Sequence, residues 1–208
     1  MCKVCGKNTK REYDKQTKSF YDFCECGFIS KERIIDGEVE YAHYAKHNNT
    51  MESTGYVKMF ETFLKKVETH FPGKSVLEYG CGPGPVLAEL LRIKDYTVKT
   101  YDKYFDHDAD YNQHLYDVVT LTEVIEHFDD PVEELEKIHK LLKSGGVVAI
   151  QTMFIKQPFF DWWYRRDYTH ISFFNDAVFE LIASKIGFSV VYSDNSSIIV
   201  LKKEQVLI

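Results

Sequence analysis

Apolar residues recur with two different periods from residue 52 onward. In the segment 52–71 they fall three and four residues apart, which predicts an amphipathic helix. Short apolar runs bounded by polar or glycine-containing turns predict β-strands. The predicted helices cover 52–71, 85–93, 131–144 and 176–186, and the predicted strands cover 75–79, 96–102, 117–121, 147–152, 188–192 and 197–201. Helices and strands that alternate in this way favour an α/β fold around a mostly parallel sheet.

The first 30 residues differ, because they have few aliphatic side chains and contain four cysteines. The pair Cys2 and Cys5 is followed by glycine, and so is the pair Cys24 and Cys26. Glycine at these points lets the backbone fold around a metal, and four thiolates complete a tetrahedral Zn²⁺ site. The segment resembles a zinc ribbon, although its second pair has the spacing C-x-C instead of C-x-x-C. The alternative is a reduced hairpin with small buried thiols.

The composition is that of a soluble globular protein, with 44% hydrophobic and 28% charged residues among 208. This length provides one core of ordinary size and a small appendage. We therefore expect a zinc-ribbon-like module at 1–30, a linker with an N-terminal helix at 31–71, and the main domain at 72–208. No apolar run approaches the ~18–20 residues that span a bilayer. The N-terminus has no apolar signal region, so the sequence predicts a cytoplasmic protein with no membrane partner.

A glycine-rich turn joins the first strand of the main domain to the next helix. Glycines stand at positions 80, 82 and 84, and Glu78 precedes the first of them by two residues. Such glycines let the chain turn sharply and let a ligand lie against bare peptide. Amides at the start of the helix can bind a carboxylate, while Glu78 supplies negative charge to a cationic ligand. Cys81 is expected to be a small lining residue, because the sequence ties no base to it.

This E-x-G-x-G-x-G pattern resembles motif I of the class I methyltransferases that use S-adenosylmethionine (SAM). The resemblance implies that the segment binds SAM, with S-adenosylhomocysteine (SAH) as the product. The implied contacts are Glu78, Gly80, Cys81, Gly82 and Gly84.

Further candidate cofactor contacts lie at the ends of the next two strands. Asp102 comes 22 residues after the first glycine, close to the offset at which an acid binds ribose hydroxyls in doubly wound folds. The resemblance also implies a cofactor contact from Lys103. The segment Thr122–His127 resembles the motif IV region E-V-[LI]-E-H of many small-molecule methyltransferases, which implies contacts from Thr122 and Glu123.

The order of elements from residue 75 resembles the Rossmann-like class I methyltransferase fold, in which a seven-stranded sheet is parallel except for its last strand. Fourteen residues, 103–116, separate the second predicted strand from the next one. The family has a helix and a third strand in this interval, so we expect a sheet that is shortened around strand three. Asp108 or Asp110 is a candidate contact for the adenine amino group.

Both tryptophans lie in the segment 158–174, among charged residues. Part of it resembles an R-D-P-T-H-[IV]-S-F sequence that lies over the methyl-donor pocket in some class I methyltransferases. His170 is the candidate general base near neutral pH, and Asp167 is placed to orient it. Tyr164 and Trp163 are candidate walls of an acceptor site. The alternative is an aromatic loop whose polar groups are bonded locally.

Two further features are open to either a functional or a structural interpretation. His127 is a candidate for proton handling or cofactor packing, and the alternative is a structural histidine that bonds the turn. The linker 31–50 is rich in aromatic and hydrogen-bonding side chains. Tyr44, His47 and Asn49 are therefore candidate lid or substrate contacts, and the alternative is a solvated linker.

Together these features predict transfer of a methyl group from SAM to an unidentified small-molecule or glycan-like acceptor. The protein's main task in such an in-line displacement is to align the reactants. Residues 1–33 carry a net charge of +3 and the remainder carries −9, which favours this acceptor over RNA. A zinc-ribbon RNA methyltransferase and a non-catalytic SAM-binding scaffold stay open as alternatives.

Overall fold

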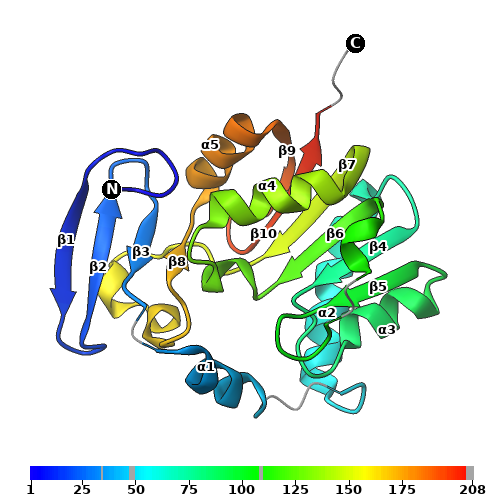
Figure 1. Cartoon of the computed structure of the whole chain (residues 1–208), viewed down its shortest axis with the longest axis horizontal. Helices are drawn as coiled ribbons and strands as arrows, with labels where there is room; N and C mark the ends of the chain where they lie inside the picture. The colour runs from blue at the N-terminus through cyan, green and yellow to red at the C-terminus, as the bar shows by residue number, and fades with distance from the viewer. Residues whose placement is uncertain (34, 47–49, 108–109, 205–208) are drawn as a thin grey trace.

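A six-stranded sheet lies at the centre of the main domain (Figure 1). The computed structural model describes residues 1–33, 35–46, 50–107 and 110–204. The strands are β4 Ser75–Tyr79, β5 Thr97–Tyr101, β6 Tyr116–Thr122, β7 Leu142–Gln151, β9 Phe188–Ser193 and β10 Ile198–Lys203, in the order β5-β4-β6-β7-β10-β9. The first four strands in this order are parallel, and β10 is antiparallel to both β7 and β9. The predicted α/β fold with an antiparallel last strand is confirmed.

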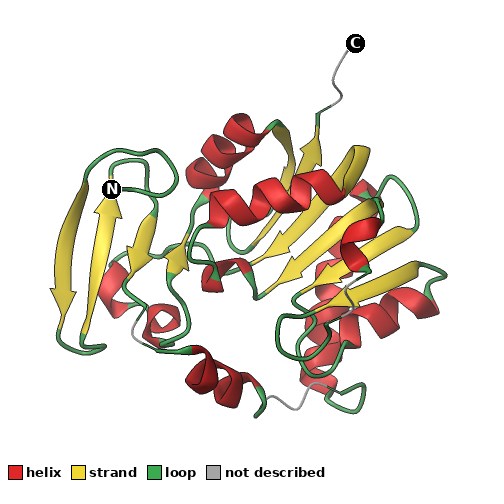
Figure 2. Cartoon of the chain, in the orientation of Figure 1, coloured by secondary structure: helices red, strands yellow, loops and turns green. Residues whose placement is uncertain are grey.

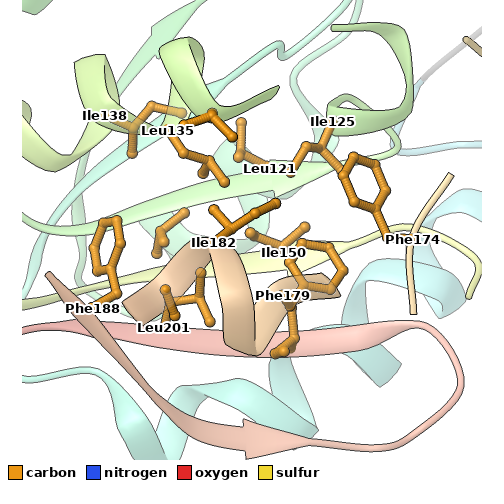
Figure 3. Packing of buried hydrophobic residues seen from close by; sticks show 14 of the residues in the cluster. Leu121, Ile125, Leu135, Ile138, Ile150, Phe174, Phe179, Ile182, Phe188 and Leu201 are labelled. Atoms are coloured by element: carbon orange, nitrogen blue, oxygen red, sulfur yellow. The ribbon is translucent and has the colours of Figure 1, made fainter. Parts of the chain in front are cut away.

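Two helices cover each face of this sheet (Figure 2). Helices α2 (Thr54–Val67) and α3 (Val86–Ile93) pack on one face, and α4 (Pro131–Leu141) and α5 (Asp176–Ile186) pack on the other. Successive strand residues point to opposite faces, so neighbours in one strand enter different cores. Figure 3 shows the core under α4 and α5, where leucine, isoleucine and phenylalanine side chains interdigitate.

The ends of α4 and α5 follow local signals in the sequence. The carboxylate of Asp130 accepts hydrogen bonds from two amides of the first turn of α4, and the side chain of Asn175 caps α5. Gly187 ends α5 with a φ of 95°, a conformation that favours glycine. Helix α4 ends at Leu141 rather than at the predicted residue 144, because β7 begins at once and pairs with β6.

The interval between β5 and β6 is short, as predicted. Its described residues form a bridge between Asp102 and Asp106 and a 3₁₀ turn at Tyr111–Gln113, with no further strand among them. The sheet thus has six strands where the seven-stranded pattern has one more beyond β5. Within the described ranges, no helix is long and apolar enough to cross a membrane.

A second, four-stranded antiparallel sheet contains the N-terminal segment (Figure 1). Its strands are β1 Thr9–Asp14, β2 Ser19–Cys24, β3 Ile29–Lys31 and β8 Ser172–Phe173, in this order. The last of them follows the tryptophan-rich loop, so the sheet combines residues 9–31 with residues 172–173. Aromatic side chains from the small sheet and this loop share one core. Helix α1 (Gly37–Tyr44) follows the sheet, within the predicted linker.

Candidate active site

The glycine turn lies between β4 and α3, at the carboxyl end of the parallel strands. Gly80 and Gly82 have φ values of 84° and 66°, which side chains rarely adopt. A Cβ at position 80 would also lie 2.5 Å from a methyl carbon of Val124, so this position requires glycine. The amides of Gly80 and Cys81 donate to the carbonyl of Tyr101, which ties the turn to the neighbouring strand.

Two side chains under the turn are buried. The Glu78 carboxylate accepts a hydrogen bond from the Ala88 amide at 2.9 Å, in the first turn of α3. Burial raises the pKa of Glu78 to about 8, so its charged form is favoured only near a cation. Burial likewise raises the pKa of the Cys81 thiol, which agrees with a lining role. Gly84 lies beyond the lining residues of the cavity, and its carbonyl accepts from Val86.

Asp102 lies beside the turn, at the end of β5. Its Oδ2 accepts a hydrogen bond from the Gly82 amide at 2.9 Å, and its Oδ1 accepts from the amides of Tyr104 and Phe105. These bonds fix the carboxylate at the rim of the glycine turn, where the sequence predicted the ribose. The next side chain, Lys103, forms an ion pair with Glu40 of α1 at 3.0 Å.

Helix α1 lies across one side of the same region. Glu40 is buried and also contacts Arg33 and the hydroxyl of Tyr104. The ring of Tyr44 packs edge-on against His127 at 5.4 Å between centroids, so this predicted lid residue does lie beside a candidate site residue. His47, Asn49 and Asp108 lie outside the described residues, and the carboxylate of Asp110 contacts Lys99 and His114.

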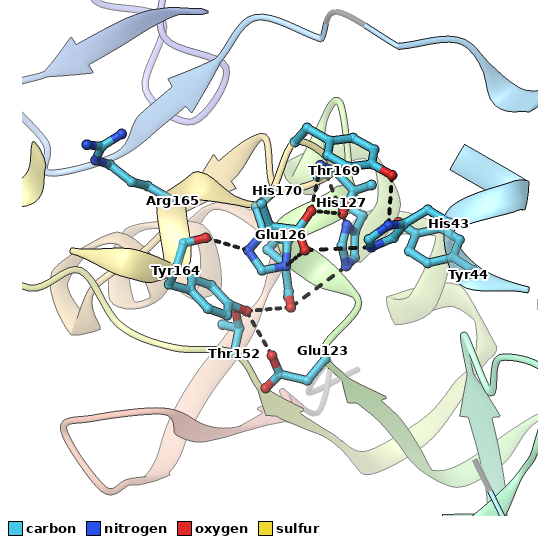
Figure 4. A network of polar contacts seen from close by, with 12 residues as sticks. His43, Tyr44, Glu123, Glu126, His127, Thr152, Tyr164, Arg165, Thr169 and His170 are labelled. Atoms are coloured by element: carbon cyan, nitrogen blue, oxygen red, sulfur yellow. Dashed lines mark hydrogen bonds and ion pairs between the residues drawn. The ribbon is translucent and has the colours of Figure 1, made fainter. Parts of the chain in front are cut away.

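A buried polar network lies at the same carboxyl edge of the sheet, in the residues that follow β6 and in the loop after β7 (Figure 4). The hydroxyl of Tyr164 lies 2.5 Å from an oxygen of Glu126 and 3.0 Å from an oxygen of Glu123. Glu123 has a φ of 55°, a strained conformation of the kind that clusters at functional sites. Burial and the neighbouring charge of Glu123 raise the pKa of Glu126. Glu126 was not among the residues predicted from the sequence, although it directly precedes His127 in the motif IV segment.

His127 and His170 are held in the same way. Nδ1 of His127 lies 3.0 Å from the carbonyl oxygen of Thr169, and Nδ1 of His170 lies 2.9 Å from that of Tyr164. A carbonyl only accepts, so each Nδ1 carries the proton and each Nε2 keeps a lone pair. Burial lowers the pKa of His127 to about 3 and that of His170 to about 4. Oδ2 of Asp167 lies 3.9 Å from Nε2 of His170.

One cavity of about 1000 Å³ extends from the glycine turn to this polar network. Its wall includes the glycine turn and Asp102 on one side, and Tyr164, Asp167 and His170 on the other. Thr122, Glu123 and His127 also line it, and so does Trp163, which is 62% exposed. The structure therefore brings the predicted cofactor and acceptor residues into contact with a shared space.

The four N-terminal cysteines form a separate cluster. Their sulfur atoms all lie within 4.8 Å of one another. Sγ of Cys2 is 3.7 Å from Sγ of Cys26, and Sγ of Cys5 is 3.4 Å from Sγ of Cys24. The C-x-C spacing therefore does not prevent either thiol of the second pair from reaching the cluster.

Comparisons with known proteins match these features to one family. The family model described as "Methyltransferase domain" matches residues 43–193. The ubiquinone biosynthesis O-methyltransferase of Vibrio atlanticus is 33% identical over 118 residues, which cover 43% of this chain and 47% of that protein. The corresponding Citrobacter koseri protein is 33% identical over 105 residues, which cover 39% and 43%. The chain spans about half the length of the curated relatives it matches.

Two solved structures show the same fold. The 1,6-didemethyltoxoflavin-N1-methyltransferase of Burkholderia thailandensis, solved with bound 1,6-didemethyltoxoflavin and SAH, has a TM-score of 0.58 at 13% identity. That match covers 94% of this chain and 100% of the other. A SAM-dependent methyltransferase from Archaeoglobus fulgidus has a TM-score of 0.55 at 16% identity and covers 71% and 94%. Because the family model matches most of the sequence, the chain belongs to the methyltransferase domain family, as its motifs predicted.

Proposed function

We propose that the protein transfers the methyl group of SAM to a hydroxyl group of a small or glycan-like acceptor. The shared cavity of about 1000 Å³ carries this proposal, because predicted cofactor residues and a polar network line the same space. Pockets for drug-sized ligands measure about 300–1,000 Å³, so SAM and a small acceptor fit together. The relatives' name, O-methyltransferase of ubiquinone biosynthesis, supports an oxygen atom in a small molecule as the acceptor.

At the cofactor end, we assign the methionine part of SAM to the glycine turn and the ribose to Asp102. Oδ2 of Asp102 accepts one hydrogen bond in the described structure, and a carboxylate oxygen has room for a second. A ribose hydroxyl would supply it. Glu78 lies under the turn, where the positive charge of SAM would favour its ionised form.

At the acceptor end, we assign the reactive hydroxyl to the space beside Tyr164, Asp167 and His170. The rigid bonds around these side chains suit a site that must hold oxygen, methyl carbon and sulfur in line. His170 offers a lone pair at Nε2 and is the candidate proton acceptor. Its loss should reduce turnover more than SAH affinity.

We further propose that the cysteine cluster binds one structural Zn²⁺. Tetrahedral sites with Zn–S bonds of ~2.3 Å place sulfur atoms about 3.8 Å apart. The separations of 3.4 and 3.7 Å agree with that value. The four thiolates would hold the ion and leave no open position, so its contribution is to the stability of the N-terminal sheet.

Calorimetric titration of SAH tests the cofactor assignment. We expect micromolar binding to the native protein and a loss of at least about tenfold in Asp102→Ala, because the ribose contact goes with the carboxylate. Asp161→Ala, an exposed aspartate outside the cavity, is the matched control and should bind SAH normally. Absence of SAH binding to the native protein would refute the proposed cofactor.

A further inference from the structure

We propose that Glu126, His127 and His170 form a binding site for one divalent transition-metal cation at the acceptor end of the cavity. One ligand atom from each of the three side chains lies within 4.8 Å of the other two. Three ligand atoms that are each ~2.1 Å from one ion can be at most about 3.6 Å from one another. Side-chain movements of up to about 0.7 Å per ligand, on the order of ordinary thermal displacements, would close the site.

The backbone already orients both imidazoles for this role. The carbonyl oxygens of Thr169 and Tyr164 accept from Nδ1 of His127 and His170, which directs the two Nε2 lone pairs elsewhere. Metal-binding histidines are held by the same arrangement, in which the second ring nitrogen donates to a carbonyl or carboxylate. The rings lie 4.9 Å apart between centroids, and both line the cavity.

Glu126 supplies the second, independent observation. Its side chain is completely buried, and its Oε2 has no hydrogen-bond partner in the described part of the structure. A buried polar atom without a partner is rare and needs an explanation. Oε1 lies 3.9 Å from Nε2 of His127 and is fixed by Tyr164 at 2.5 Å. A cation bound by both carboxylate oxygens would also satisfy Oε2.

A ligand role and a base role compete for the same lone pair of His170. The hydrogen bond from Nδ1 to the carbonyl oxygen of Tyr164 fixes the tautomer in which Nε2 can bind a metal. If the cation is bound, His170 is one of its ligands, and the base role given to it under the proposed function falls away.

Two histidines and one carboxylate leave coordination positions open, and the cavity is the space available to them. Resting on the proposed methyl transfer, we infer that the acceptor is a hydroxyl compound whose oxygen takes such a position. Coordination lowers the pKa of the hydroxyl, so its proton is released to water. The oxygen then forms the bond to the methyl carbon as the carbon–sulfur bond breaks, which leaves SAH.

Titration with Mn²⁺, followed by electron paramagnetic resonance, tests the site. This ion prefers oxygen ligands such as carboxylates to thiolates, so the cysteine cluster does not compete for it. We expect one bound Mn²⁺ per chain and nitrogen couplings from coordinated imidazole in the pulsed spectrum. Glu126→Gln and His170→Gln should weaken binding by at least about tenfold. His114→Gln, an exposed histidine outside the cavity, is the control and should leave binding unchanged.

Two results would overturn the proposal: no binding to the native protein at millimolar Mn²⁺, or bound Mn²⁺ without nitrogen coupling. Because the couplings are measured on the native protein, they decide the matter even where a variant does not fold. SAH calorimetry on the same samples separates the two hypotheses. If the native protein binds SAH normally but does not bind Mn²⁺, only the cation site is refuted. If the native protein does not bind SAH, the cofactor assignment is refuted.

Discussion

Replacing Asp14 by alanine should destabilise the protein by about 3–5 kcal/mol, the usual cost of leaving a buried charge unpaired. The side chain of Arg165 is 1% exposed, and its Nη1 donates to Oδ2 of Asp14 at 2.6 Å. Its remaining donors bind the side chain of Gln16 and the carbonyl of Phe160. Asp14 ends β1 and Arg165 lies in the loop before β8, so this pair joins the small sheet to the main domain.

Removing the other member of the pair, by Arg165→Met, should reduce the free energy of unfolding by less than Asp14→Ala does. Asp14 is 11% exposed and keeps hydrogen bonds from the amide and hydroxyl of Thr17. Replacing both members of a buried pair by apolar residues is often close to neutral. The double variant Asp14→Ala/Arg165→Met should therefore be at least as stable as Asp14→Ala.

Urea unfolding measured by tryptophan fluorescence gives these free energies, since Trp162 and Trp163 belong to the same loop as Arg165. Asp22→Ala is the matched control, because Asp22 forms a half-exposed pair with Arg11 in the same sheet; such pairs contribute about 0–1 kcal/mol. The reasoning fails if Asp14→Ala costs less than about 1 kcal/mol, or if the double variant costs the sum of the two single ones.

Two further predictions concern stability. Burial would raise the pKa of Asp194, but Lys66 and the amides of the closing turn outweigh burial and hold that pKa below its ordinary value of 3.8. The ionised carboxylate therefore stabilises the folded protein above pH 3.8, and this stabilisation is lost as the pH falls below that value. Asp194→Asn should cost about 1–3 kcal/mol at pH 7 and reduce the loss of stability in acid, as measured by urea unfolding; an unchanged acid profile would contradict this. Removal of Zn²⁺ by a chelator should expose the amides of β1–β3 to hydrogen exchange. Zinc content should fall in Cys26→Ser but not in Cys81→Ala, and equal zinc in all three proteins would refute the assignment.

Local signals account for the parts of the fold that could be predicted. Strand β4 has the predicted bounds 75–79, because an apolar run there ends at a glycine turn. The caps Asp130 and Asn175 were also recognisable, since a capping side chain acts on amides two or three residues away. The glycine turn and Asp102 were predictable as one site for a similar reason. Parallel strands end at the same edge of a sheet.

Contacts between distant segments left little trace in the sequence. Strand β8 has only two residues and forms by pairing with β3. Two residues are too few to show an alternation of apolar and polar positions in the sequence. The importance of Glu126 comes from complete burial beside Tyr164, 38 residues later in the chain. The burial of Arg165 depends on Asp14, which lies 151 residues earlier in the chain. Such roles follow from packing, and packing requires the three-dimensional structure.

The small sheet is placed to shape the acceptor end of the cavity. Nζ of Lys31 in β3 donates to the backbone carbonyl of Asp167 at 2.6 Å, and the hydroxyl of Tyr21 in β2 donates to that of Arg165 at 3.1 Å. These carbonyls belong to the loop that carries Tyr164 and His170, whose own positions depend on backbone hydrogen bonds. The hydrogen bonds of the glycine turn and Asp102, in contrast, involve β4, β5, α3 and residues 104–106, and among the described residues none of them involves the small sheet. Changes in the small sheet should therefore reach the acceptor residues before they reach the cofactor residues.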